Sequence, residues 1–161
     1  MSKSNYDKKI TIEELQEFMK SVGPNTKVFY GSDSERYKHN GVWYADYFCV
    51  IVIHVDGCHG GKVFAEVSTE ADHDQNVDRP FNRLMTETQK VAELFLRTKE
   101  VFYDYEIEIH LDIARDEKWG SNCAAQAATG YIKGVCQVTP VLKNDSFAAS
   151  FCADRGREFI H

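Results

Sequence analysis

Two short acidic motifs stand where the sequence predicts the ends of apolar strands. The stretch FYGSDSERY (29–37) places Asp33 between two serines, directly after a run of strand-forming residues. The stretch IHLDI (109–113) places Asp112 near the end of a second such run. An aspartate after a strand is commonly a turn former, but a carboxylate that projects from a sheet edge can also bind a hard divalent cation. Both interpretations stay open on these residues alone.

A third acidic residue, Glu87, falls within a helix that the sequence predicts from about Pro80 to Lys99. At about 100° per residue, Glu87 lies roughly 80° from the centre of the apolar stripe of this helix. A glutamate on the flank of a helix can reach over the edge of a sheet, or it can be a solvated residue beside Lys90. The position of Glu87 on the helix, taken alone, favours the interpretation as a solvated residue.

Two aspartates near the end of the chain are candidates for a fourth carboxylate. Asp145 stands at the start of a predicted last helix, where capping is a sufficient structural explanation. Asp154 precedes Arg155 and can form a surface ion pair with it. The two aspartates would be roughly 13 Å apart along a helix, so both cannot bind one compact site. The residues leave open which of them would do so.

Apolar periodicity and turn signals predict the elements that must position these side chains. Thr11 and Glu14 make a capping box, and Asn40-Gly41 is a tight-turn signal between two strands. Three antiparallel strands followed by alternating helices and strands exclude a plain doubly wound sheet. The predicted elements are a helix at 11–22, strands at 27–33, 42–55 and 62–68, a helix at 80–99, a strand at 105–113, a helix at 121–132, a strand at 135–141 and a helix over about 145–154.

Length and composition fit a single globular domain over 1–161. The 161 residues are 43% hydrophobic and 12% aromatic, which excludes a disordered chain. No apolar run approaches the roughly 20 residues that span a bilayer, and the stretch MSKSNYDKKI is not a signal peptide, so we expect a soluble, cytoplasmic protein. The five cysteines form no CxxC pair, which excludes zinc-ribbon and thioredoxin-like sites. The net charge of −6 disfavours broad, non-specific binding to nucleic acid.

The element order and three short patches give the chain a resemblance to a known superfamily. The patches are GSDS (31–34), IHLDI (109–113) and AASFCADR (148–155), and the element order covers about residues 27–157. On these features the chain resembles the ribonuclease H-like superfamily and, within it, the YkuK family. The resemblance implies an α/β fold with a mixed five-stranded sheet, in which parallel strands are added to three antiparallel ones. Helices flank this sheet, and an extra N-terminal helix precedes it.

The resemblance also implies a metal site. The superfamily holds two Mg²⁺ or Mn²⁺ ions with carboxylates from strand one, the next helix, strand four and the last helix. The resemblance further implies that strands one and four are parallel neighbours, so that their carboxylates lie side by side. Adjacent carboxylates repel, and a bound cation removes that cost, which favours a metal site. Matched to this sequence, the ligands are Asp33, Glu87 in NRLMTE (82–87), Asp112, and Asp145 or failing that Asp154.

The activity implied by the resemblance is metal-dependent hydrolysis of phosphodiester bonds in RNA, RNA–DNA hybrids or structured DNA, with nucleic acid as the partner. The alternative is a catalytically inactive module that keeps the fold and binds a protein or nucleic acid, with Tyr37, Trp43 and Trp119 as candidate contacts. A strand-transfer enzyme is a third, weaker hypothesis. The oligomeric state is open, with a homodimer through an edge strand or the first helix as one arrangement.

Two histidines have a chemical and a structural interpretation. His110 shares the polar face of the predicted fourth strand with Asp112 and could shuttle protons, but a hydrogen-bonded structural histidine is favoured. His73 lies between Asp72 and Asp74 in the motif ADHD. The motif could form a second metal site, but short motifs match by chance, and a mobile polar loop is favoured. Because this loop precedes the helix predicted at 80–99, it could also gate the site.

Overall fold

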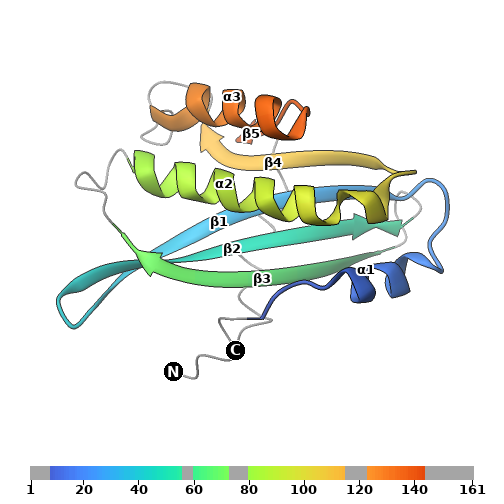
Figure 1. The fold of residues 1–161 in the computed structure, drawn as a ribbon, viewed down its shortest axis with the longest axis horizontal. Helices are drawn as coiled ribbons and strands as arrows, with labels where there is room; N and C mark the ends of the chain where they lie inside the picture. The colour runs from blue at the N-terminus through green and yellow to red at the C-terminus, as the bar shows by residue number, and fades with distance from the viewer. Residues whose placement is uncertain (1–7, 56–59, 73–79, 115–122, 144–161) are drawn as a thin grey trace.

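A mixed sheet of five strands forms the centre of the protein (Figure 1). The computed structural model describes residues 8–55, 60–72, 80–114 and 123–143. The strand order is β3-β2-β1-β4-β5, and β1 pairs antiparallel with β2 but parallel with β4. The expected mixed sheet and the parallel pairing of strands one and four are therefore confirmed. The strands are β1 (Lys27–His39), β2 (Val42–His54), β3 (Gly61–Ala71), β4 (Glu106–Ala114) and β5 (Val141–Lys143).

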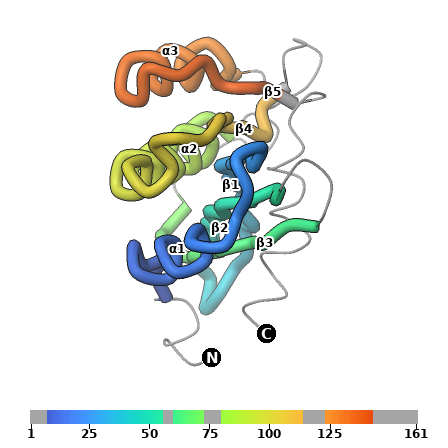
Figure 2. The backbone as a smooth tube through the Cα atoms, turned by 90° about the vertical axis from the view of Figure 1, so that its right-hand side faces the viewer, coloured from blue at the N-terminus to red at the C-terminus, as the bar shows by residue number. Residues whose placement is uncertain are grey.

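The helices lie together on one face of this sheet (Figure 2). Leu15, Val91 and Ile132, one from each α-helix, belong to the same buried cluster as Tyr30 and Ile109 of the sheet. This cluster is the main hydrophobic core, and it holds α2 across the middle of the sheet. The helical elements are α1 (Ile12–Met19), α2 (Phe81–Thr98), the 3₁₀-helix η3 (Lys99–Phe102) and α3 (Ala125–Cys136).

The opposite face of the sheet buries a second apolar cluster. Successive side chains of a strand point to opposite faces, so β2 contributes Ile51 and Ile53 to the main core and Val50 and Val52 to the second cluster. This explains the nearly continuous apolar run in β2, which the sequence predicts for a strand buried on both faces. The second cluster consists of Phe29, Phe48, Val50, Val52, Val63 and Val67.

The hairpin of β1 and β2 extends well beyond the predicted end of the first strand (Figure 1). Its turn is Asn40-Gly41, where both residues have positive φ, as a tight two-residue turn requires. The antiparallel pairing runs without interruption to His39 and Val42. The prediction that the strand ends at Asp33 is therefore wrong. The polar residues SERYKH remain in the paired strand, because in this part of the hairpin the two faces of the strand do not both have to be buried.

The third helix and fifth strand differ from their predicted bounds. The sequence predicts a helix at 121–132 that stops before Gly134, followed by a strand at 135–141. Instead α3 runs through Gly134 to Cys136, and β5 covers only Val141–Lys143. Ile132 and Cys136 are both buried and lie one turn apart on the same side, so packing continues the helix past the glycine. The predicted start of the helix at Ser121 and the predicted last helix lie outside the described residues.

The first two α-helices also differ in detail from the prediction. The capping box of Thr11 and Glu14 is present, with both reciprocal hydrogen bonds, but α1 ends at Met19 rather than near residue 22. The apolar side chains that the sequence predicts along one side of α2 are buried, with the exception of Phe81. Phe81 is 43% exposed because it occupies the first turn, beyond the edge of the main core.

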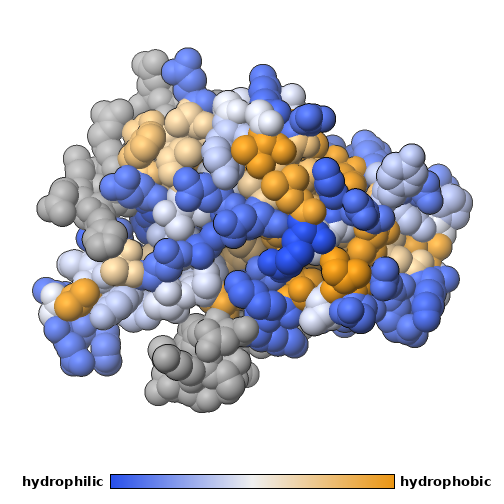
Figure 3. Space-filling view, viewed as in Figure 1, coloured by the Kyte–Doolittle hydropathy of each residue, from blue (hydrophilic) through white to orange (hydrophobic). Residues whose placement is uncertain are grey.

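Exposed apolar side chains are interspersed with hydrophilic ones on the face of the described residues that Figure 3 shows, where hydrophobic atoms lie mainly in the central and right-hand parts. Such scattered exposure is ordinary for protein surfaces. It does not favour any particular dimer, so the homodimer stays a prediction. The large exposed apolar residues among those described are Val42, Trp43, Phe81, Leu96, Tyr103 and Val135.

Candidate functional site

The parallel ladder between β1 and β4 places the two predicted aspartates at neighbouring positions. The last registered pairs are Gly31 with His110 and Ser32 with Leu111, so Asp33 and Asp112 are the next residues on the two strands. Residues in register on adjacent strands point to the same side of a sheet. Asp33 and Asp112 therefore share a face, which is the condition on which the metal-site hypothesis depends. Both residues are partly buried.

Glu87 of α2 lies on the helix-bearing face of the sheet, where Ser34 contacts it, whereas Asp33 belongs to the opposite face, like its strand partner Phe48 of the second cluster. Glu87 is only 5% exposed, which corrects the expectation of a flank residue that is neither buried nor fully outside. Burial is the largest cause that raises the pKa of Glu87 well above its usual value, and the negative charges of Asp33 and then Asp112 raise it further. The charges of both aspartates thus reach the Glu87 carboxylate, although the aspartates belong to the opposite face of the sheet.

A hydrogen-bond relay holds the Glu87 carboxylate. The hydroxyl of Ser34 donates to Glu87 Oε2 at 3.0 Å, and Arg83 Nη1 donates to Ser34 Oγ at 3.2 Å. Both the Ser34 hydrogen bond and the Arg83 charge act to lower the pKa of Glu87, but they do not outweigh burial and the aspartates. Although Ser34 is the sequence neighbour of Asp33, its hydroxyl thus contacts Glu87.

Arg83 is a site residue that sequence reasoning missed. It lies one helical turn before Glu87, a spacing that brings two side chains to the same side of a helix. That spacing is the only signal that could have identified it. Asn82 and Thr86, its neighbours on α2, line the same cleft as Arg83 near the start of this helix.

The donor set fits Mg²⁺ or Mn²⁺ by its chemistry. Carboxylate oxygens are the hard ligands that such ions prefer, and a cation would offset the electrostatic cost recorded in the raised pKa of Glu87. Among the described residues, however, no three acidic, histidine or cysteine side chains are arranged as a ready group of metal ligands. The two candidates for the fourth carboxylate, Asp145 and Asp154, lie outside the described residues. The ligand set therefore stays a prediction.

His110 has the environment of a structural histidine. It is 1% exposed, its Nε2 lies 2.9 Å from Glu108 Oε2, and its ring packs edge-on against Phe29 with centroids 5.3 Å apart. Burial tends to raise the pKa of Glu108, but hydrogen bonds from His110 and Lys27 outweigh it, and the pKa is lowered. These contacts give a physical basis to the favoured interpretation of His110 as a hydrogen-bonded structural histidine. His73 lies outside the described residues.

The aromatic residues of the hairpin contact their own neighbours. The rings of Tyr37 and Tyr44 stack with centroids 5.9 Å apart. The guanidinium of Arg36 lies 4.0 Å from the centre of the Trp43 ring and also forms an ion pair with Asp72. Trp43 keeps 39% of its surface exposed. These contacts are those of side chains that pack on the hairpin, while Trp119 lies outside the described residues.

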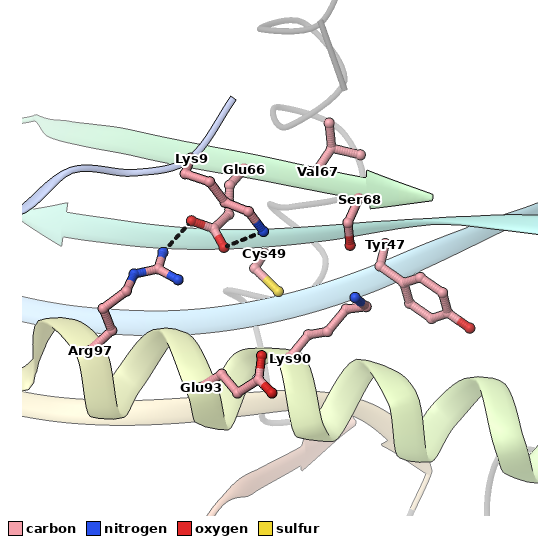
Figure 4. A pocket seen from close by; sticks show the side chains of 9 residues that line it. All are labelled: Lys9, Tyr47, Cys49, Glu66, Val67, Ser68, Lys90, Glu93 and Arg97. Carbon is pink, nitrogen blue, oxygen red and sulfur yellow. Dashed lines mark hydrogen bonds and ion pairs between the residues drawn. The ribbon is translucent and has the colours of Figure 1, made fainter. Parts of the chain in front are cut away.

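A small polar pocket near α2 is filled by its own ion pairs. Figure 4 shows Glu66 of β3 between Arg97 and Lys9, and Glu66 also accepts the backbone N–H of Ile10 at 3.0 Å. The cavity measures about 30 Å³, which is the room of one or two waters. This cluster is therefore suited to anchoring the segment before α1, and not to binding a substrate.

Comparison with known proteins identifies the family. A family model described as ribonuclease H-like, of the YkuK type, matches residues 10–157. The chain therefore belongs to the ribonuclease H-like family, as the sequence motifs and the element order predict. Comparisons with curated proteins and with solved structures found no match. No helix among the described residues is long and apolar enough to cross a membrane.

Proposed function

We propose that the protein is a metal-dependent nuclease that hydrolyses phosphodiester bonds in RNA, RNA–DNA hybrids or structured DNA. The observation that supports the proposal is the neighbouring placement of Asp33 and Asp112 on one face at the end of the β1–β4 ladder, together with the effect of both charges on Glu87 of α2. Membership of the ribonuclease H-like family supports this assignment. Asp145, or failing that Asp154, would complete the set.

In this proposal the carboxylates hold two Mg²⁺ or Mn²⁺ ions. When bound, such ions generate a hydroxide nucleophile and stabilise the leaving oxygen. Asp33 and Asp112 would hold these ions, together with Glu87. Glu87 must lose its proton to act as a ligand, so its raised pKa makes metal affinity increase with pH. Ser34 keeps the Glu87 carboxylate oriented toward the sheet.

The direct test replaces Asp33 with asparagine and measures cleavage of labelled RNA, hybrid and branched DNA during a titration with Mg²⁺ or Mn²⁺. We expect at least about a 100-fold loss of rate, because a bound metal ion supplies several kcal/mol of charge stabilisation. Asp104→Asn is the matched control, since Asp104 is exposed and lies before β4, away from the carboxylates. The proposal fails if the unaltered protein neither binds these ions nor cleaves any of the substrates.

A non-catalytic binding module is the second candidate. One observation favours it: the Glu87 carboxylate already accepts a hydrogen bond from Ser34, which is itself bonded to Arg83. A module of this kind should bind its partner equally well after Asp33→Asn and Asp112→Asn, with or without a chelator. Binding that is lost on chelation of the metal would argue for the nuclease instead.

A further inference from the structure

A second, larger cleft opens on the helix-bearing face of the sheet, next to the part of α2 that carries Glu87. It lies between the first turns of α2 and the adjoining parts of β2 and β3, and its volume is about 370 Å³. This volume falls within the range of about 300–1,000 Å³ that is typical of small-molecule sites. It is large enough for one nucleotide but not for a stacked duplex. Its polar lining residues are Tyr47, Asp72, Asn82, Arg83, Thr86 and Gln89.

The lining combines one cation with neutral hydrogen-bonding groups. Arg83 brings a guanidinium, which matches the geometry of a phosphate. The charge of Asp72, the acidic member of the lining, is balanced by its ion pair with Arg36.

Tyr47 is only 3% exposed, and its hydroxyl hydrogen-bonds with Thr86. The hydroxyl of Thr86 in turn donates to the backbone carbonyl of Asn82 at 2.8 Å. The groups of the lining that can both donate to and accept from a ligand are therefore the amides of Asn82 and Gln89.

Arg83 links this cleft to the carboxylates. Its guanidinium lines the cleft and also donates to Ser34 Oγ at 3.2 Å, and Ser34 in turn donates to Glu87 at 3.0 Å. A phosphate on Arg83 would therefore be linked to the Glu87 carboxylate through three hydrogen bonds, by way of Arg83 and Ser34. Such a separation suits the phosphate that neighbours the one being cleaved.

We propose that the cleft holds one unpaired nucleotide of the substrate strand, with its phosphate on Arg83 and its base and sugar against the neutral polar lining. This inference rests on the proposed function and deepens it, because it makes a single-stranded segment next to the cleavage point part of the substrate. Nucleotide chemistry matches the lining on two counts: a single cation meets a single phosphate, and neutral donors and acceptors meet a base edge.

The first experiment measures binding of 5′-mononucleotides in EDTA by calorimetry, so that no metal and no cleavage are involved. We expect a mononucleotide to bind at least about 10-fold more tightly than its nucleoside or inorganic phosphate alone. Arg83→Gln should weaken nucleotide binding by about 10- to 100-fold, the range for hydrogen bonds to a charged group. Lys133→Gln removes the same charge from an exposed position of α3 and should change nothing.

A second variant covers the case in which Arg83→Gln disturbs folding. Gln89 is exposed on α2 and lines the cleft, so Gln89→Trp should fill the cleft while the helix and its circular dichroism are preserved. This variant should abolish mononucleotide binding. Binding that survives both substitutions, or inorganic phosphate that binds as tightly as the nucleotide, would overturn the inference.

The two proposals can fail separately. Asp112→Asn should bind mononucleotides like the unaltered protein but should not cleave. If metal-dependent cleavage occurs and neither Arg83→Gln nor Gln89→Trp affects nucleotide or strand binding, the cleft assignment is wrong and the nuclease stands. If nucleotides bind through Arg83 and no metal supports cleavage, the cleft assignment stands and the nuclease is wrong.

Discussion

Glu87 carries much of the electrostatic cost of bringing three acids together. Its carboxylate is buried, and both neighbouring aspartates act to raise its pKa. A carboxyl group with a higher pKa in the folded than in the unfolded protein binds its proton more tightly when folded. The stability that it contributes therefore falls as the pH rises above about 4.5, the ordinary glutamate value, and toward its folded pKa.

Glu87→Gln should therefore stabilise the metal-free protein at high pH. We expect its free energy of unfolding to exceed that of the unaltered protein by at least about 1 kcal/mol at pH 8, since each pKa unit corresponds to about 1.4 kcal/mol. The difference should shrink toward pH 4.5. Urea unfolding in EDTA across this range measures it, with Glu93→Gln, an exposed residue of the same helix, as the control. A variant that is less stable at pH 8 would show that the charge of Glu87 is compensated in the fold.

For single residues, the sequence identifies candidate site residues better than it identifies the side chains that contact them. Asp33 and Asp112 could be identified because each follows a run of apolar strand residues, and the structure places them at neighbouring positions on one face. The burial of Glu87 could not be predicted, since a flank position on a helix is equally compatible with solvent. The relay through Ser34 and Arg83 depends on how α2 lies over β1, which no local pattern records.

Among the elements, those with strong periodicity were predicted well. The alternation in β4 and the apolar run in β2 define strands because each pattern matches the burial of a strand. The turn predicted at Asn40-Gly41 is present, but two other predictions from glycine or polarity are wrong. The helix α3 does not end before Gly134, and β1 does not end where its polar residues begin after Asp33. In both places long-range packing or pairing continues the element, and this information lies elsewhere in the chain.

The position of Gly134 inside α3 leads to a stability prediction. A Cβ atom added there would meet nothing within 4 Å, so Gly134→Ala should stabilise the protein by about 0.5–1 kcal/mol through the lower chain entropy of the unfolded state. Gly41→Ala is the matched control of opposite sign. Its site is equally open, but its φ of +80° strains an alanine, and we expect a loss of about 1 kcal/mol. Urea unfolding measures both. A loss of stability in Gly134→Ala would mean that the helix ends before this residue.

On the scale of the whole molecule, Glu66 connects three parts of the chain. It belongs to β3, pairs with Arg97 of α2, and accepts the backbone N–H of Ile10 ahead of α1 (Figure 4). The remaining contact, with Lys9, is longer at 3.8 Å. This arrangement attaches the N-terminal segment to the sheet and to the central helix at once.

Glu66→Ala should therefore loosen the N-terminal segment and lower the free energy of unfolding by about 1–3 kcal/mol, because the Ile10 N–H loses its acceptor. Hydrogen exchange should become faster at Ile10 and through α1. Glu70→Ala is the control: Glu70 is about half exposed and pairs only with Lys90 among the ion pairs of the described residues, so its loss should cost less than about 0.5 kcal/mol. Unchanged exchange at Ile10 would show that the apolar contacts of α1 suffice to hold the segment.

The ladder between β1 and β4 joins Lys27 to Glu106, whereas the hairpin of β1 and β2 closes over a two-residue turn. Contacts between residues far apart in a chain form late, because a large loop must close first. During translation the hairpin that carries Asp33 can be complete while Asp112 is still unmade. If the proposed function holds, a polypeptide that is still being synthesised lacks the complete catalytic site. It therefore cannot cleave the messenger RNA that encodes it until β4 has left the ribosome.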